Sequence, residues 1–168
     1  MAALPFAMSS SALLETLAAT MHENYRREAV AKGWPIKPEV DKPYAELSSD
    51  YQKANQDAAS RIPQVLGSLD VKVVAASEAG DEALSATALA DLIDANIEKL
   101  SIAEHEGWTQ QRADAGWTYA AKRDDSQKQH PSMVPYDDLS EADKEKDRNQ
   151  VRSYPALLEQ AGLKATLS

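Results

Sequence analysis

The sequence predicts a mainly α fold in which two helix–loop–helix repeats, related by a pseudo-two-fold axis, share one core, with a short strand after each repeat. Three observations predict it. Two blocks of the chain each match a later block without a gap, apolar residues recur at helical spacing, and a short alternating segment follows each block. A helix pair with one strand cannot bury its own apolar face, so we expect a shared core.

The repeat is visible in two alignments. Residues 14–34 align with 97–117, and residues 43–66 align with 135–158. The first alignment contains the identical pairs Glu15/Glu98, Leu17/Leu100, His22/His105, Glu23/Glu106, Gly33/Gly116 and Trp34/Trp117. The second contains Pro43/Pro135, Tyr44/Tyr136, Leu47/Leu139, Ser48/Ser140, Pro63/Pro155 and Leu66/Leu158.

These matches predict a single domain over residues 1–168. Copy one, the degenerate repeat, covers residues 1–75 in this prediction, a linker covers 76–85, and copy two, the complete repeat, covers 86–168. The boundaries follow the ends of the matched blocks.

The first helix of each copy is predicted from its spacing and its ends. Residues 1–21 lack the basic segment of a signal peptide and lead into a helix. In copy two, one apolar helical face is formed by Leu89, Leu92, Ile93, Ile97 and Leu100. The Gly107–Trp108 step should end or bend that helix. Gly33 and Gly116 stand where a left-handed residue ends a helix.

The second helix of each copy begins near a serine and carries a late proline. Ser48 and Ser140 are predicted N-caps, and Pro63 and Pro155 should kink or end the helices. Two segments that follow alternate apolar and polar residues as half-buried strands do, 69–74 and 163–167. We expect these two strands to pair with each other.

Copy two differs from copy one in a long loop, residues 117–136. Between the shared Gly-Trp and Pro-Tyr pairs, copy one has residues 35–42 and copy two has residues 118–134. An irregular segment of this length in a compact domain is usually functional or disordered. Because shared framework residues hold both ends, we predict that the long loop is ordered and carries the function.

The composition limits the function classes. The formal charge of −9 argues against nucleic acid or an anionic membrane as partner. The chain has no cysteine, which excludes disulfides and thiol catalysis and indicates a reducing, cytoplasmic location. Outside the start, the longest purely apolar run is the four residues VVAA, so we expect no membrane-spanning segment.

The sequence has no catalytic or metal-binding pattern that we recognise. His22-Glu23 and His105-Glu106 begin like the zinc-binding HExxH pattern, but the second histidine is missing. We therefore interpret these residues as helix-surface or helix-end residues. With three histidines and no cysteine, a zinc site is not expected. The prediction is no enzymatic activity, no cofactor and no metal.

A set of uncommon residues follows in a distinctive order: Gly116, Trp117, Tyr119, Arg123, Asp124, Asp125, Lys128, His130, Pro131, Val134, Pro135, Tyr136, Leu139, Ser140, Lys146, Asp147 and Arg148. This order resembles the signature of the ryanodine-receptor repeat domain family, over about a third of the chain. Ala120 stands where glycine is common in the family, and Met133 replaces an aliphatic residue. Copy one lacks the Arg-Asp-Asp, Lys and His-Pro elements.

The resemblance implies two helical halves related by a pseudo-two-fold axis, with short strands and one prominent loop. Family members occur in tandem in the cytosolic assembly of animal calcium-release channels, and as small proteins or modules in bacteria and phages. This chain resembles the small prokaryotic or phage type with two tandem repeats. For bacterial members the family suggests a nucleotide-type ligand such as an ADP-ribose derivative, and no enzymatic activity. In the animal channels the loop is phosphorylated, which makes Ser126 and Ser132 candidates by analogy.

Candidate residues fall into two groups. Structural roles are predicted for Trp34, Tyr44, Gly33, Gly116, Asp147 and Arg148, and Arg148 is expected to order the loop through Asp124 or Asp125. Ligand-binding roles are predicted for Trp108, Trp117, Tyr119, Arg123, Asp124, Lys128, His130 and Tyr136. Trp117 and Tyr136 also occur in copy one, which favours a framework role for both. Trp108 either packs on the Trp117 loop or stacks on a ligand base.

An aromatic face beside a guanidinium suits a phosphorylated nucleotide, which predicts a non-enzymatic module for a nucleotide or an ADP-ribose-like anion. In the alternative interpretation the loop binds no ligand, and Arg123 and Lys128 pair with Asp124 and Asp125 in a solvated loop. A second function class is a protein-interaction module with residues 117–136 as its docking surface.

Overall fold

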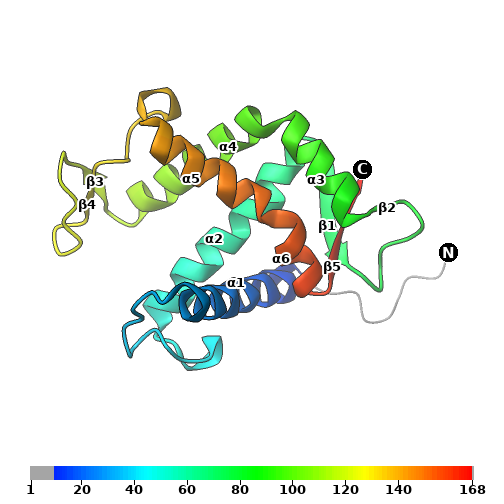
Figure 1. Ribbon diagram of the computed structural model, residues 1–168, viewed down its shortest axis with the longest axis horizontal. Coiled ribbons are helices and arrows are strands. Elements are labelled where there is room, and N and C mark those ends of the chain that lie inside the picture. Colours follow the sequence, from blue (N-terminus) through cyan, green and yellow to red (C-terminus); the bar gives the residue numbers. More distant parts are fainter. Residues whose placement is uncertain (1–9, 168) are drawn as a thin grey trace. The chain divides into compact units, whose positions relative to one another are not determined.

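The computed structural model describes residues 10–167 and confirms a mainly α chain with short strands (Figure 1). The α-helices are α1 (Ser10–Lys32), α2 (Ser49–Gly67), α3 (Ala86–Ala95), α4 (Ile97–Asp114), α5 (Glu141–Arg152) and α6 (Tyr154–Gln160). The 3-10 turns are η1 (Tyr44–Glu46) and η2 (Tyr136–Asp138). The strands are β1 (Val71–Ala75), β2 (Ala83–Leu84), β3 (Thr118–Tyr119), β4 (Gln129–His130) and β5 (Leu163–Leu167). Of the predicted lead-in, residues 1–9 lie outside the described residues.

The described residues form two compact units. Unit 1 comprises residues 10–89 and 155–167, and unit 2 comprises Ala90–Tyr154. These units differ from the two sequence copies because copy two supplies β5 to the sheet of unit 1.

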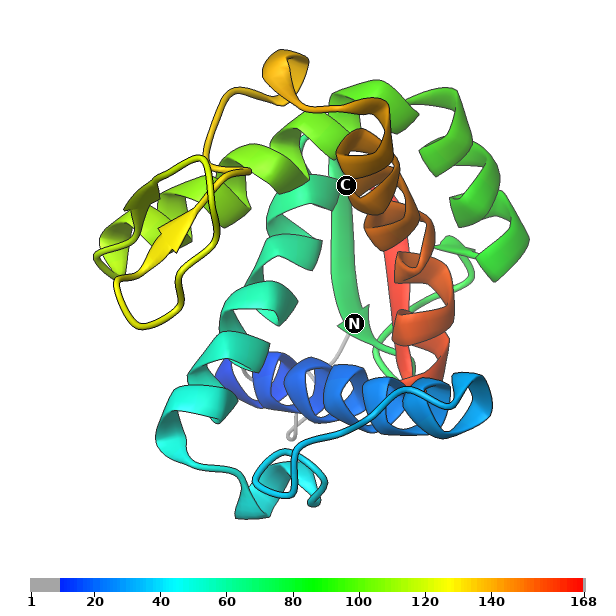
Figure 2. The same ribbon diagram turned by 60° about the vertical axis from the view of Figure 1, so that its left-hand side comes forward.

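Unit 1 combines the α1–α2 pair with a three-stranded sheet of order β1-β5-β2 (Figure 2). Strands β1 and β5 are antiparallel, with Val71 opposite Leu167 and Ala75 opposite Leu163, so the predicted pairing is confirmed. The segment predicted as a linker, 76–85, contributes β2. Fully buried side chains at the core include Leu17, Ile62 and Leu66.

The two prolines behave differently from each other. Helix α2 runs through Pro63 to Gly67, so the prediction that this proline ends the helix is wrong. An interior proline removes one helical hydrogen bond, and burial of Ile62 and Leu66 on the same turns offsets that cost. Pro155 is the second residue of α6, where its missing N–H is tolerated, and the preceding helix ends before it, as predicted.

Unit 2 packs α4 against α5 and η2. The predicted apolar helix breaks at Asn96, whose φ of −127° and ψ of 24° are not helical and whose side chain donates to the Leu92 carbonyl at 2.9 Å. Helix α4 then continues through Gly107–Trp108, so the predicted end at that step is wrong. Leu100, Val151 and Tyr154 are fully buried and form the core of this unit.

The predicted helix ends are confirmed in both copies. Gly33 and Gly116 have φ values of 69° and 91°, in the left-handed region that favours glycine. The Ser48 hydroxyl accepts a hydrogen bond from the backbone N–H of Tyr51 at 3.4 Å. The Ser140 hydroxyl accepts one from Asp143 at 3.2 Å.

Candidate functional site

The long loop is held in shape by its own contacts. Strands β3 and β4 pair in parallel, with Thr118 opposite Gln129 and Tyr119 opposite His130. The Asp124 carboxylate accepts from the Ser126 hydroxyl at 2.6 Å and from the backbone N–H groups that follow it. These hydrogen bonds, that of Ser126 foremost, lower the pKa of Asp124. The loop is therefore ordered, and its turn depends on Asp124.

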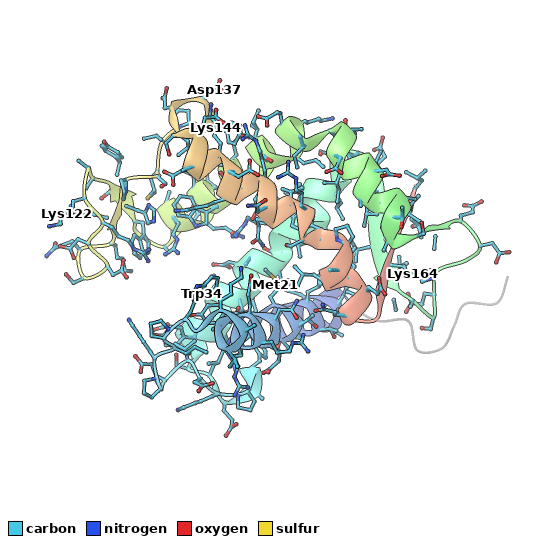
Figure 3. The ribbon with its side chains drawn as sticks, in the orientation of Figure 1. Met21, Trp34, Lys122, Asp137, Lys144 and Lys164 are labelled. Carbon is cyan, nitrogen blue, oxygen red and sulfur yellow. The ribbon has the colours of Figure 1, made fainter. Side chains whose placement is uncertain are left out.

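Cationic side chains of the loop are engaged as well. Lys128 has a φ of 53°, and its Nζ donates to the Ala115 carbonyl at 2.9 Å, next to the helix-ending glycine. The Arg123 guanidinium lies 2.7 Å from the Asp125 carboxylate. Lys122 and Tyr119 are exposed, and Figure 3 shows Lys122 at the outer side of the loop.

The long loop meets the C-terminal half of α4 (Figure 2). An aromatic cluster lies at this junction. The ring centroids of Trp108 and His130 are 5.0 Å apart in an edge arrangement, and those of Trp117 and His130 are 6.5 Å apart. The guanidinium carbon of Arg112 lies 4.6 Å from the centroid of Trp117 and 5.5 Å from that of Trp108. Both indoles are half-buried and carry a cation at one face.

His130 is held in its neutral form. Its Nδ1 accepts the backbone N–H of Ser132 at 3.0 Å, which leaves Nε2 to carry the ring proton. Burial lowers the pKa of His130, and the positive charges of Arg123 and Arg112 lower it further.

His105 is the buried centre of the site. It stacks on Trp108 with ring centroids 5.7 Å apart, and its centroid lies 6.3 Å from that of Tyr136. Its Nε2 lies 2.7 Å from the Val134 carbonyl, and its Nδ1 lies 3.3 Å from the Asp147 carboxylate. The predicted structural role of Asp147 thus has a definite partner.

The second buried contact of the loop runs through Tyr136. Its hydroxyl donates to Glu98 at 2.9 Å, and burial together with this carboxylate raises the pKa of Tyr136 to about 12. Glu98 in turn accepts from Arg148 at 2.6 Å, and Arg148 also bonds Glu141 and Glu145. The hydrogen bonds from Arg148 and Tyr136 lower the pKa of Glu98.

The expectation that Arg148 orders the loop through Asp124 or Asp125 is wrong within the described part of the chain. Arg148 lies beside the carboxylates of its own helix and of α4, whereas Asp124 faces the turn that it closes. Arg148 still supports the loop, at its far end, through Glu98 and Tyr136.

Copy one repeats the framework contacts at aligned positions. His22 Nε2 lies 2.6 Å from the Lys42 carbonyl, as His105 does from Val134. Gln56, aligned with Arg148, donates to both Tyr44 and Glu15. The predicted framework residue Trp34 is 46% exposed, and Lys32 Nζ lies 4.8 Å from its ring centroid.

The structure brings part of the predicted set together. Trp108 and Tyr136 adjoin His105, His130 adjoins Trp108, and Trp117 adjoins His130. Arg123 and Asp124 are engaged in contacts of the loop itself, and Lys128 donates to the Ala115 carbonyl at the end of α4. Tyr119, at 56% exposure, lies at the surface.

Two residues of the cluster, His105 and Arg112, were not among the predicted site residues. The interpretation of His22 and His105 as helix-surface or helix-end residues is wrong, since they are 2% and 3% exposed. Each ring can be buried because a loop carbonyl accepts a hydrogen bond from its N–H. The recurrence of this histidine in both copies was the available signal. The sequence gives no such signal for Arg112, because its contacts with Trp108 and Trp117 depend on where the long loop packs against α4.

A hollow of about 350 Å³ lies elsewhere, in unit 1, where β5, α6 and the start of α3 meet. Its walls are both apolar and polar, with Leu84, Leu89, Leu158 and Leu163 beside Glu159 and Lys164. None of the predicted ligand residues lines this hollow.

The chain matches a known family model over part of its length. A family model described as the RyR domain matches residues 83–166, which is half of the chain. Among residues 10–167 no helix has the length and apolar character needed to cross a bilayer. The same residues contain no group of three or more His, Cys, Asp or Glu side chains placed to hold a metal ion.

Proposed function

The chain belongs to the RyR domain family, and from this premise we propose that it is a non-enzymatic module that binds a small anionic ligand on the long loop. The ligand class is a nucleotide or an ADP-ribose-like molecule. The observation that carries the proposal is the aromatic cluster, in which Trp108, Trp117 and His130 are gathered beside Arg112.

The cluster offers the two kinds of contact that such a ligand needs. The indole of Trp117 is half-buried with Arg112 at one face, and a second flat group can use the remaining exposed part. After burial, the positive charges of Arg123 and Arg112 are the next causes that lower the pKa of His130, so both guanidinium groups lie near this ring. In a chain of net charge −9, a site with only a few cations suits a small anion better than a polyanion.

A thermal-shift panel of adenine nucleotides, NAD, ADP-ribose and cyclic ADP-ribose tests the proposal. A ligand present at a hundred times its dissociation constant adds about 2.7 kcal/mol to the free energy of unfolding. In a chain of this size, that corresponds to a rise in Tm of roughly 5–11 °C. A panel without any shift at millimolar concentrations would count against a ligand of this class.

A pair of matched variants locates the site. Arg123 and Lys53 are both exposed cations that pair with a nearby aspartate, Asp125 and Asp57 respectively. Because exposed pairs of this kind contribute little to stability, neither alanine variant should change the unliganded Tm appreciably. Arg123→Ala should weaken binding of the ligand found in the panel, and Lys53→Ala should leave it unchanged. If the two variants bound the ligand with equal affinity, the long loop would not be part of the binding site.

A protein-docking role is the second candidate, favoured by the exposure of Tyr119 on the ordered loop and of Lys122, which is labelled in Figure 3. Tyrosines are enriched at the centre of protein interfaces, and the rim around that centre is polar. The test is a pull-down with the intact chain and with a variant lacking residues 121–132. A specific partner that is lost with this segment, while helicity measured by circular dichroism is kept, would favour docking over ligand binding.

A further inference from the structure

His105 connects three parts of unit 2 through one buried ring. It belongs to α4, its Nε2 reaches the Val134 carbonyl in the long loop at 2.7 Å, and its Nδ1 reaches the Asp147 carboxylate on α5 at 3.3 Å. A carbonyl and a carboxylate both only accept hydrogen bonds. A neutral imidazole has one N–H and can satisfy one of them, whereas the imidazolium has two and can satisfy both.

Copy one provides an internal comparison. His22 makes the same bond to a loop carbonyl, that of Lys42, at 2.6 Å. The residue aligned with Asp147 is Asn55, and its amide donates to the Tyr51 carbonyl. The carbonyl bond is therefore shared framework and needs a single N–H, while the carboxylate acceptor occurs at the histidine of copy two.

The other charged and titratable groups near His105 have contacts of their own. On α5, Lys144 lies 5.5 Å from the centroid of the Tyr136 ring, and Arg148 is bonded to Glu98. On η2, Tyr136 keeps its proton because its pKa is raised. Beyond Trp108, burial and then the positive charges of Arg123 and Arg112 lower the pKa of His130 on β4.

Two carboxylates thus dominate the field at the ring. Burial lowers the pKa of His105, but the hydrogen bonds to Asp147 and to the Val134 carbonyl, with the charges of Asp147 and Glu106, raise it by more, and the net shift is upward.

We propose that His105 is a proton-controlled latch of the long loop, in which the buried imidazolium ties Val134 to Asp147 and loss of its proton breaks the tie to Asp147. The neutral ring keeps its bond to Val134 and turns an unprotonated Nδ1 toward the carboxylate, so two acceptors face each other. The latch concerns the loop that carries the proposed function, but it operates without any ligand.

The direction of the pH dependence follows from the upward shift. A histidine whose pKa is higher in the folded state contributes stability that is complete below its ordinary value of about 6.5, and that stability is lost as the pH rises through the folded value. The long loop is therefore tightly held at acidic to neutral pH and is loosened on the alkaline side.

The experiment is an NMR titration of the intact chain with amide-exchange protection factors for Thr118 and Gln129, whose N–H groups bond inside the loop. His105 should titrate above about 6.5. If opening of the loop frees the ring, the two protection factors should fall about tenfold for each pH unit by which the His105 midpoint is raised. This relation ties a local titration to the order of a distant part of the loop, and a purely structural histidine would not produce it.

Asp147→Asn and Asp143→Asn form a matched pair on one helix. Asp147 faces His105, whereas Asp143 lies 3.3 Å from Lys146 at the surface. The first variant should lower the His105 midpoint by about one unit or more, and the second should leave it in place. The proposal is overturned if His105 of the unmodified chain titrates at or below its ordinary value, or if Asp147→Asn leaves the midpoint unchanged. It is also overturned if the protection factors stay constant while His105 titrates, and this arm requires no variant to fold.

Discussion

Replacing Leu17 or Leu100 by alanine tests whether the two copies unfold as one domain. The two leucines are aligned in the repeat, both are fully buried, and they lie in different compact units. A buried Leu→Ala change removes transfer free energy and leaves a cavity, at a cost of about 2–5 kcal/mol. For a chain of this length, a loss of about 3 kcal/mol lowers Tm by roughly 6–12 °C.

The tryptophans allow the two units to be followed separately. Trp34 belongs to unit 1, and Trp108 and Trp117 belong to unit 2. In a Trp34→Phe background, fluorescence reports unit 2, while far-ultraviolet circular dichroism reports the helices of both units. The single-domain prediction requires that Leu17→Ala and Leu100→Ala each shift one common transition in both signals.

The reasoning is refuted if Leu17→Ala shifts the dichroism signal and leaves the fluorescence transition in place, since the units would then unfold independently. Val30→Ala serves as the control. Val30 is 79% exposed on α1, so this change should alter the free energy of unfolding by less than about 0.5 kcal/mol.

Three further predictions concern single residues. Tyr154→Phe removes the hydroxyl that donates to buried Glu104 at 2.9 Å, and urea denaturation should show a loss of about 1–3 kcal/mol; no loss would mean that this bond is not needed. Gly33→Ala places a side chain at a φ of 69° and should lower the free energy of unfolding by about 1–2 kcal/mol. Gly67→Ala, which has open space around the new Cβ, should raise it by up to about 1 kcal/mol. A change of the same sign in both variants would contradict the backbone argument. The pKa of His130 is lowered, so its neutral ring contributes stability that is present above about pH 6.5 and is lost as the pH falls toward the lowered value. The free energy of unfolding of His130→Gln should therefore fall less on acidification than that of the unmodified chain. An equal fall in both proteins would show that His130 does not cause the loss of stability in acid.

The features that the sequence predicted well are those decided within a few residues. A left-handed glycine at a helix end and a serine N-cap depend on local backbone geometry, and Gly33, Gly116, Ser48 and Ser140 are found as expected. The alternating segment 163–167 is a strand because one of its faces is buried.

The features that escaped depend on partners far along the chain. Strand β2 has two residues, too few for any periodicity, and exists because β5 offers it an edge. Helix α2 passes Pro63 because tertiary burial outweighs a local preference. The buried His105 bonds a carbonyl 29 residues away. Arg148 pairs with Glu98, 50 residues away, and not with the loop aspartates, which are nearer in the sequence. Propensity and spacing carry no information on such choices.

The position of β5 in the middle of its sheet has a consequence for how the chain can be divided. Both β1 and β2 take their hydrogen-bonding partner from residues 163–167, so neither is completed until that segment has been made. The segment that matches the family model, 83–166, contains β2 and nearly all of β5 but excludes β1. A fragment cut at those limits would leave one edge of β5 open, with a row of unpaired N–H and C=O groups available to a second molecule. We therefore expect the excised segment to self-associate, whereas the chain that includes residues 71–75 covers this edge.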